Sequence, residues 1–187
     1  MKNAPRDDEK PAARRRHRLL RAFFLAVLLS ALGAAALAFA EDGRWNTYTS
    51  ARYGTTADYP GYLFTVRDVA PANGDGQGFR TVDGRAQLLI YGARNIENDT
   101  PQSYLAKYVD LDGVTVSYRR VTAQFYVVSG TRGDSIIYER CNFGRVPPGV
   151  IHCVGLAYPA DEKETWDPIV ARLGASLRVG QGIEPGE

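Results

Sequence analysis

The sequence predicts an α+β domain in which an antiparallel β-sheet is covered by a C-terminal helix and a short middle helix. Most of residues 45–158 form short apolar or alternating segments separated by turn residues, a pattern typical of strands. The segments are joined by short connections, whereas parallel pairing needs crossovers of a dozen or more residues. Residues 166–177 then follow the apolar period of a helix, and this segregation of elements defines the α+β class.

The first forty residues differ from the rest of the chain and predict export. A basic stretch at 14–18 precedes an uncharged segment from Ala22 to Ala40, which ends in the small-residue pattern Ala38-Phe39-Ala40. This order is typical of a secretory signal peptide. A segment of this length also just spans a hydrocarbon core of about 30 Å, so a retained membrane anchor is the alternative.

Both interpretations place the rest of the chain beyond the inner membrane. We expect residues 1–40 to be a signal peptide or N-terminal membrane anchor, residues 41–179 a single α+β domain, and residues 180–187 a flexible tail. The domain is expected to be periplasmic or extracellular, tethered to the inner membrane by residues 19–40 if that segment is retained. Membrane contact is expected only through this N-terminal segment.

Charge divides the chain in the same place. Of 23 Lys and Arg and 21 Asp and Glu, residues 1–40 hold eight and three, so residues 41–187 have 15 basic and 18 acidic residues and a net charge of −3. A weakly acidic domain gains little from counterion release, which drives binding to nucleic acids. Nucleic acid is therefore excluded as the expected partner.

The first half of the domain predicts two hairpins. Pro60-Gly61 and Asp83-Gly84 are turn pairs, and Asp-Gly between strands is a strong hairpin signal because both residues can adopt positive φ. The glycine-rich segment 73–78 is expected to be a tight loop, because it lacks the carboxylates of a calcium site and the Lys of a phosphate loop. The strands predicted around these turns are 53–59, 62–66, 80–82 and 86–91.

The second half predicts two helices and a further run of strands. Thr100-Pro101 opens a short helical pattern, because a missing N–H costs little at a helix start. The C-terminal helix is expected from Pro168 to about Leu177, with Asp161 and Glu164 as a capping box for an earlier turn. The predicted strands are 114–122, 124–129, 135–141 and 150–158. The apolar face of the final helix is Trp166, Ile169, Val170, Leu173 and Leu177.

This order of elements and one local signal resemble a known family. Ala51-Arg52-Tyr53-Gly54, followed by the sequence from Asp58-Tyr59-Pro60-Gly61 to Phe64, resembles the Tyr-Gly…Tyr-Pro opening of Mog1/PsbP-like domains. The resemblance spans residues 45–178 in layout. It implies a central antiparallel sheet with helices on both sides, in a small bacterial envelope protein. The family has diverse roles and no shared catalytic residues, so the resemblance implies no active site.

The two cysteines predict a structural disulfide. Cys141 and Cys153 lie on strands that flank a proline-rich turn, and both are equally distant from residue 147. A hairpin centred there places them opposite each other, within reach of a disulfide, and an exported domain is exposed to an oxidising compartment. A redox-active pair is the alternative, but the close spacing and helix start that lower a thiol pKa are missing.

No constellation of residues predicts catalysis, and we expect neither a cofactor nor a metal. His152 is the only histidine after the leader, and with Cys153 it does not supply a zinc ligand set. Ser129, Asp134 and His152 could form a hydrolase triad, although no Gly-x-Ser-x-Gly motif surrounds Ser129. The sequence predicts an exported, non-catalytic envelope domain that binds a protein, cell-wall or small-molecule partner. The alternative is a periplasmic hydrolase-like enzyme using Ser129 and His152.

Aromatic and basic side chains on two strands are the candidate binding face. Such residues are enriched at interaction hot spots, although strand alternation divides them between the two faces of a sheet. The candidate residues are Tyr118, Arg119, Arg120, Tyr138 and Arg140.

Overall fold

The computed structural model describes residues 44–144 and 149–180, and the predictions for the leader and for residues 181–187 lie outside them. The strands are β1 (Trp45–Thr49), β2 (Thr56–Pro60), β3 (Val66–Arg67), β4 (Gly76–Arg80), β5 (Gln87–Arg94), β6 (Thr115–Val121), β7 (Phe125–Arg132), β8 (Ser135–Phe143) and β9 (Val150–Pro159). The helical elements are α2 (Pro101–Tyr108), the 3-10 turn η1 (Ala160–Glu162) and α3 (Lys163–Ser176).

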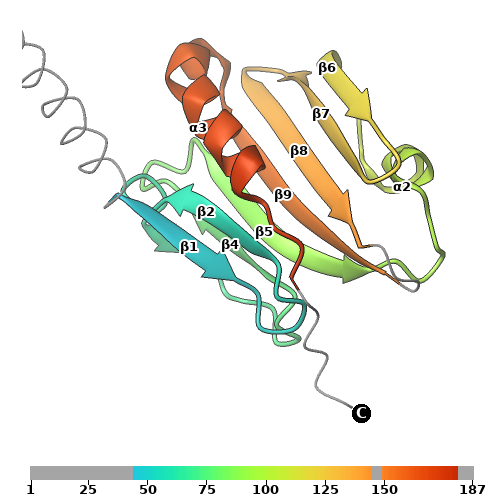
Figure 1. The fold of residues 1–187 in the computed structure, drawn as a ribbon. Helices are drawn as coiled ribbons and strands as arrows, with labels where there is room; N and C mark the ends of the chain where they lie inside the picture. Colours follow the sequence, from blue (N-terminus) through green and yellow to red (C-terminus); the bar gives the residue numbers. More distant parts are fainter. Residues whose placement is uncertain (1–43, 145–148, 181–187) are drawn as a thin grey trace, which may run out of the picture. The chain divides into compact units, whose positions relative to one another are not determined.

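The described strands form two antiparallel sheets. β1 and β2 make a two-stranded sheet, and the others make a seven-stranded sheet in the order β3-β4-β5-β9-β8-β7-β6. In Figure 1, α3 and the β1–β2 pair lie side by side over the same face of the larger sheet. The predicted antiparallel sheet with a covering C-terminal helix and a short middle helix is confirmed.

Strand alternation creates a separate hydrophobic core on each face of the sheet. On β9, Val154, Leu156 and Tyr158 belong to the core beneath α3 and the β1–β2 pair. Ile151 and Cys153 point the opposite way and join a second core with Leu105 of α2. The two helices therefore cover opposite faces of one sheet.

The C-terminal helix begins earlier than predicted. α3 starts at Lys163, so Pro168 lies inside the helix rather than at its first position, and Glu162 makes no capping hydrogen bond through its side chain. A proline inside a helix removes one backbone hydrogen bond. Trp166 explains the earlier start, because its ring stacks on Tyr158 with centroids 5.3 Å apart and its Nε1 donates to Glu162 Oε2 at 3.0 Å. The predicted capping box of Asp161 and Glu164 is not formed.

The first quarter of the domain departs most from prediction. Residues 62–65 are not a strand, because the turn after Pro60 brings the amides of Leu63 and Phe64 back onto the Pro60 carbonyl. The second strand of this hairpin instead precedes β2, since the unpredicted β1 pairs with β2 in register. Phe64 is buried against Trp166, with ring centroids 5.9 Å apart, so it contributes to the core without strand pairing.

The second half of the glycine-rich segment 73–78 belongs to a strand. Gly76 and Gly78 belong to β4, where they pair with Tyr91 and Leu89 of β5. A Cβ atom on Gly76 would lie 2.5 Å from the Ile90 carbonyl oxygen. The glycine is therefore required by close contact between strands and not by a turn.

The Asp-Gly hairpin forms with a longer loop than predicted. β4 and β5 pair as expected, but six residues, 81–86, connect them. Within this loop, only Gly84 has positive φ, at 70°. Asp83 acts through its side chain, whose Oδ1 accepts from Thr81 Oγ1 at 2.6 Å and from the Arg85 amide at 3.1 Å. These bonds close the longer loop without positive φ at the aspartate.

Candidate functional site

Four of the five candidate binding residues share one face of the sheet. Tyr118 lies opposite Ser129, which lies opposite Tyr138, and Arg120 is related to Arg140 in the same way through Val127. A bulge between Val116 and Tyr118 sets this register. Arg119 points to the other face, as strand alternation requires. Tyr118, Arg120, Tyr138 and Arg140, together with Phe125, are called the β6–β8 face below.

The two arginines of the β6–β8 face converge on one aromatic ring. The guanidinium carbons of Arg120 and Arg140 lie 5.4 and 4.8 Å from the centroid of the Phe125 ring. Cation–π contact of this kind holds a guanidinium over an aromatic face. Arg140 Nε also donates to Asn142 Oδ1 at 3.1 Å. The arginine side chains are therefore held near one another by neutral partners.

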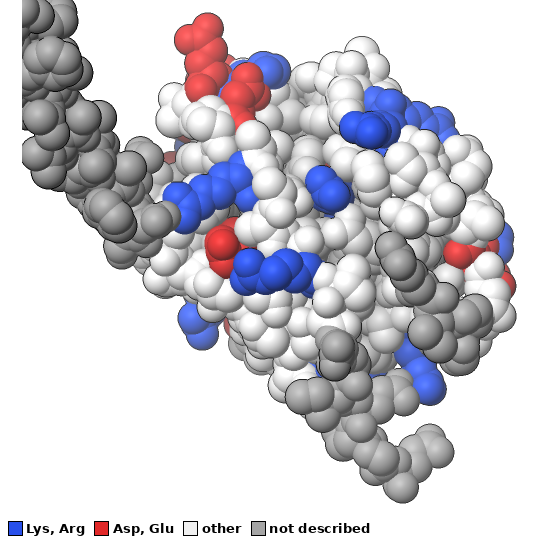
Figure 2. Space-filling model, in the orientation of Figure 1, with Lys and Arg blue, Asp and Glu red and all other residues white. Residues whose placement is uncertain are grey.

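Acidic side chains are missing from the β6–β8 face. Among the described residues, neither Arg120 nor Arg140 forms an ion pair with a carboxylate. Figure 2 shows Lys and Arg atoms over β7 and β8 without acidic atoms among them. Two guanidinium groups without counter-ions can form charge-assisted, bidentate hydrogen bonds to a carboxylate or phosphate.

The tyrosines of this face have different roles. Tyr118 on β6 is half-exposed and available for contact. Tyr138 is partly buried beneath α3, where a Cβ atom on Gly174 would collide with its hydroxyl. Burial raises the pKa of Tyr138, and Arg140 partly opposes this. The face available to a partner is therefore Tyr118, Arg120 and Arg140 around Phe125, with Tyr138 supporting it from below.

The two cysteines lie opposite each other on neighbouring strands, as the sequence predicts. Cys141 and Cys153 are register partners across β8 and β9, and their sulfur atoms are 1.99 Å apart, at bonding distance. Both side chains are fully buried in the core beneath α2. The cross-link joins the strand that carries Tyr138 and Arg140 to the centre of the sheet.

The structure does not assemble a hydrolase triad. Ser129 Oγ donates to the Ile137 carbonyl at 2.8 Å, and His152 Nδ1 is hydrogen-bonded to Thr55 Oγ1 at 2.7 Å. The register partners of Ser129 and His152 on β8 are four residues apart, which is about 13 Å along the strand. Asp134 lies at the end of β8 still farther from His152. His152 is also buried, so these side chains cannot act on one substrate together.

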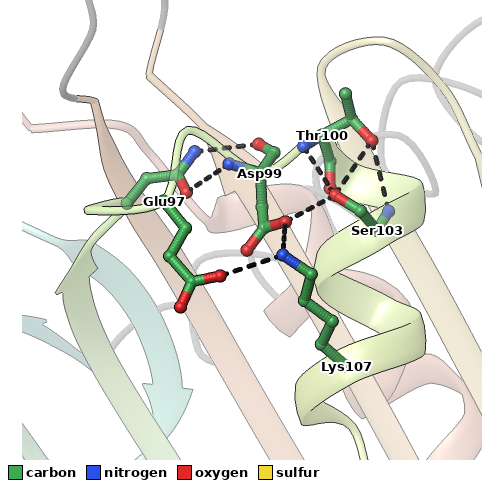
Figure 3. A network of polar contacts seen from close by, with 6 residues as sticks. Glu97, Asp99, Thr100, Ser103 and Lys107 are labelled. Atoms are coloured by element: carbon green, nitrogen blue, oxygen red, sulfur yellow. Dashed lines mark hydrogen bonds and ion pairs between the residues drawn. The ribbon is translucent and has the colours of Figure 1, made fainter.

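A polar network surrounds the start of α2. The sequence predicted this helix start but not the network. Asp99 is buried and accepts from Lys107 Nζ at 2.6 Å and Ser103 Oγ at 2.7 Å (Figure 3). Lys107 also donates to Glu97 at 3.0 Å. These bonds lower the pKa of Asp99, the lysine contributing most. The network anchors α2 to the loop that follows β5, and it leaves Lys107 fully engaged.

The described part of the chain has no cluster of three or more His, Cys, Asp or Glu side chains arranged to hold a metal. Within residues 44–144 and 149–180, no helix combines the length and apolarity needed to cross a bilayer.

The arrangement of sheet and helices defines the class as a PsbP-like α+β fold. The solution structure of cyanobacterial PsbP (CyanoP) from Synechocystis sp. PCC 6803 matches this chain with a TM-score of 0.54 and 14% sequence identity, covering 73% of this chain and 92% of that one. No family model and no curated protein matches the sequence. The fold resemblance inferred from the Tyr-Gly…Tyr-Pro opening is therefore confirmed.

Proposed function

We propose that this chain is an exported, non-catalytic envelope domain that binds an anionic partner through the β6–β8 face. The observation that carries this proposal is the convergence of Arg120 and Arg140 on Phe125 without a described carboxylate beside them. Arginine and tyrosine on a firmly supported surface are typical of interaction hot spots. The partner is an acidic protein surface, an anionic cell-wall component or an anionic small molecule.

Export is supported by the basic and apolar leader in the sequence and by the cysteine pair at bonding distance. Disulfides persist in oxidising compartments such as the bacterial periplasm. The PsbP-like fold fits the same proposal, because it carries the sheet face without an assembled catalytic triad.

A capture experiment with paired charge reversals tests the binding face. The tagged protein is used to capture partners from envelope extract, as wild type and as Arg120→Glu, Arg140→Glu and Arg119→Glu variants. Arg119→Glu is the matched control, because it makes the same charge change on the same strand but on the opposite face. We expect Arg120→Glu and Arg140→Glu to lose the partner, and Arg119→Glu to retain it.

The experiment also separates binding from catalysis. Ser129→Ala should leave capture and cellular function unchanged, because Ser129 Oγ is bonded to a backbone carbonyl of the sheet. Equal loss of the partner in all three arginine variants would refute the assignment of the face. Loss of function in Ser129→Ala with an unchanged melting temperature would refute the non-catalytic proposal.

A further inference from the structure

A groove crosses the sheet on the face opposite the β6–β8 face. Its volume is about 480 Å³, within the range of small-molecule sites. Its floor is a row of register partners from four adjacent strands, and Tyr108 and Val109 at the end of α2 stand at its side. The row consists of Leu89, Gly155, Glu139 and Val128.

Gly155 leaves open space at the centre of this floor, although the fold does not require a glycine at this position. It lies within β9, a central strand, and its φ is not positive. A Cβ atom added there would meet no atom within 4 Å. Glycine weakens a strand interior, and where neither a turn nor packing requires it, it marks a place where a ligand comes close to the backbone. Leu89, beside it, is 46% exposed despite lying in an inner strand.

Glu139 places one unpaired carboxylate in the groove. Its Oε1 accepts a hydrogen bond from the buried Tyr126 hydroxyl. Burial raises the pKa of Glu139, and the Tyr126 hydrogen bond partly opposes this. No described Lys, Arg or His forms an ion pair with Glu139. The carboxylate is therefore the charge in the groove that an incoming cation would neutralise.

The other charged residues that line the groove, and Lys107 next to Tyr108, already have partners. Lys107 of α2 is engaged by Glu97 and Asp99, as Figure 3 shows. At the rim, Arg132 pairs with Asp110 at 3.0 Å, and Asp68 pairs with Arg80 at 2.6 Å. The charged residues that line the groove are thus paired except for Glu139, and Arg119, which follows Val128 in the same row on β6, lies outside the lining.

We propose that this groove binds a small organic cation, an amine with an apolar body. The ammonium group would donate to Glu139, and the apolar body would lie over Gly155 between Leu89 and Val128. A charge-assisted hydrogen bond in a partly desolvated site favours a cation over a neutral ligand of the same shape. Tyr108 at the side adds an aromatic surface for the apolar body. The site is independent of the β6–β8 face, which lies on the other side of the sheet.

Phenethylamine is a suitable probe. Phenethyl alcohol and phenylacetate are neutral and anionic analogues of similar shape and serve as controls. The isotope-labelled protein is titrated with each compound while amide NMR shifts of Leu89, Val128 and Gly155 are followed. We expect saturable shifts with the amine and binding at least about tenfold weaker for the alcohol, with none for the acid. Absence of saturable shifts with the amine, or equal affinity for amine and alcohol, would overturn the proposal.

Two variants test the assigned roles. Glu139→Gln keeps an acceptor for the Tyr126 hydroxyl and should abolish the preference for amine over alcohol. Gly155→Val fills the groove with a residue that suits a strand, so amine affinity should fall at least about tenfold while the melting temperature is kept or raised. Glu164→Gln, an exposed change on α3, is the matched control and should bind as wild type does. An unchanged preference in Glu139→Gln would refute the role of this carboxylate.

Discussion

We expect the protein to lose stability at low pH because His152 is buried. The imidazole is 1% exposed and bonded through Nδ1 to Thr55 Oγ1, and burial lowers its pKa to about 4. An unfolded chain has a histidine pKa of about 6.5. Between these values the unfolded state binds more protons, so stability falls as pH falls from about 6.5 to about 4. At about 1.4 kcal/mol per pKa unit, the loss is on the order of 3 kcal/mol.

Denaturant unfolding at a series of pH values measures this loss. His152→Gln keeps a hydrogen-bonding group near Thr55 but does not titrate, so its stability should vary much less between pH 6.5 and 5. Glu139 acts in the opposite direction, because its raised pKa makes the folded state bind the extra proton as pH falls. Both proteins are therefore compared in a Glu139→Gln background. Parallel pH curves for the histidine and glutamine proteins would refute the reasoning.

Three further predictions concern the fold and its processing. Leu173→Ala should cost about 2–5 kcal/mol, because Leu173 is buried on the inner face of α3. The exposed Thr165→Ala should be nearly silent in the same unfolding assay, and equal melting temperatures of the two variants would mean that α3 does not pack on the sheet. Cys153→Ala should lower stability in oxidising buffer by on the order of 3 kcal/mol, and reductant should lower the melting temperature of wild type but not of the variant. Mass spectrometry of the envelope form should show cleavage after Ala40, and an N-terminus near Met1 would indicate a retained anchor.

Local patterns determined much of the second half of the domain. Alternation in β6 and apolar runs in β7–β9 indicate strands, and their short connections leave antiparallel pairing as the available arrangement. The symmetry of Cys141 and Cys153 about residue 147 already specifies their register, which the structure reproduces. The apolar period of residues 166–177 likewise identifies the face of α3 that is buried. These features depend on neighbours in the chain, which the sequence displays directly.

Other features depend on contacts between distant segments. β1 carries a weak strand pattern and is specified by pairing with β2, and the start of α3 is set by the contact of Trp166 with Tyr158. Sequence alternation could separate Arg119 from Arg120, but only the β6–β7–β8 register brings Arg120 beside Arg140. The groove residues Leu89, Gly155 and Glu139 are brought together by pairing among β5, β9 and β8. By itself the sequence determined the fold class, the cysteine pairing and the apolar helix face, because each follows from periodicity or symmetry within a short stretch of sequence. Only the tertiary structure decided which distant side chains share a surface, because that depends on strand order and register.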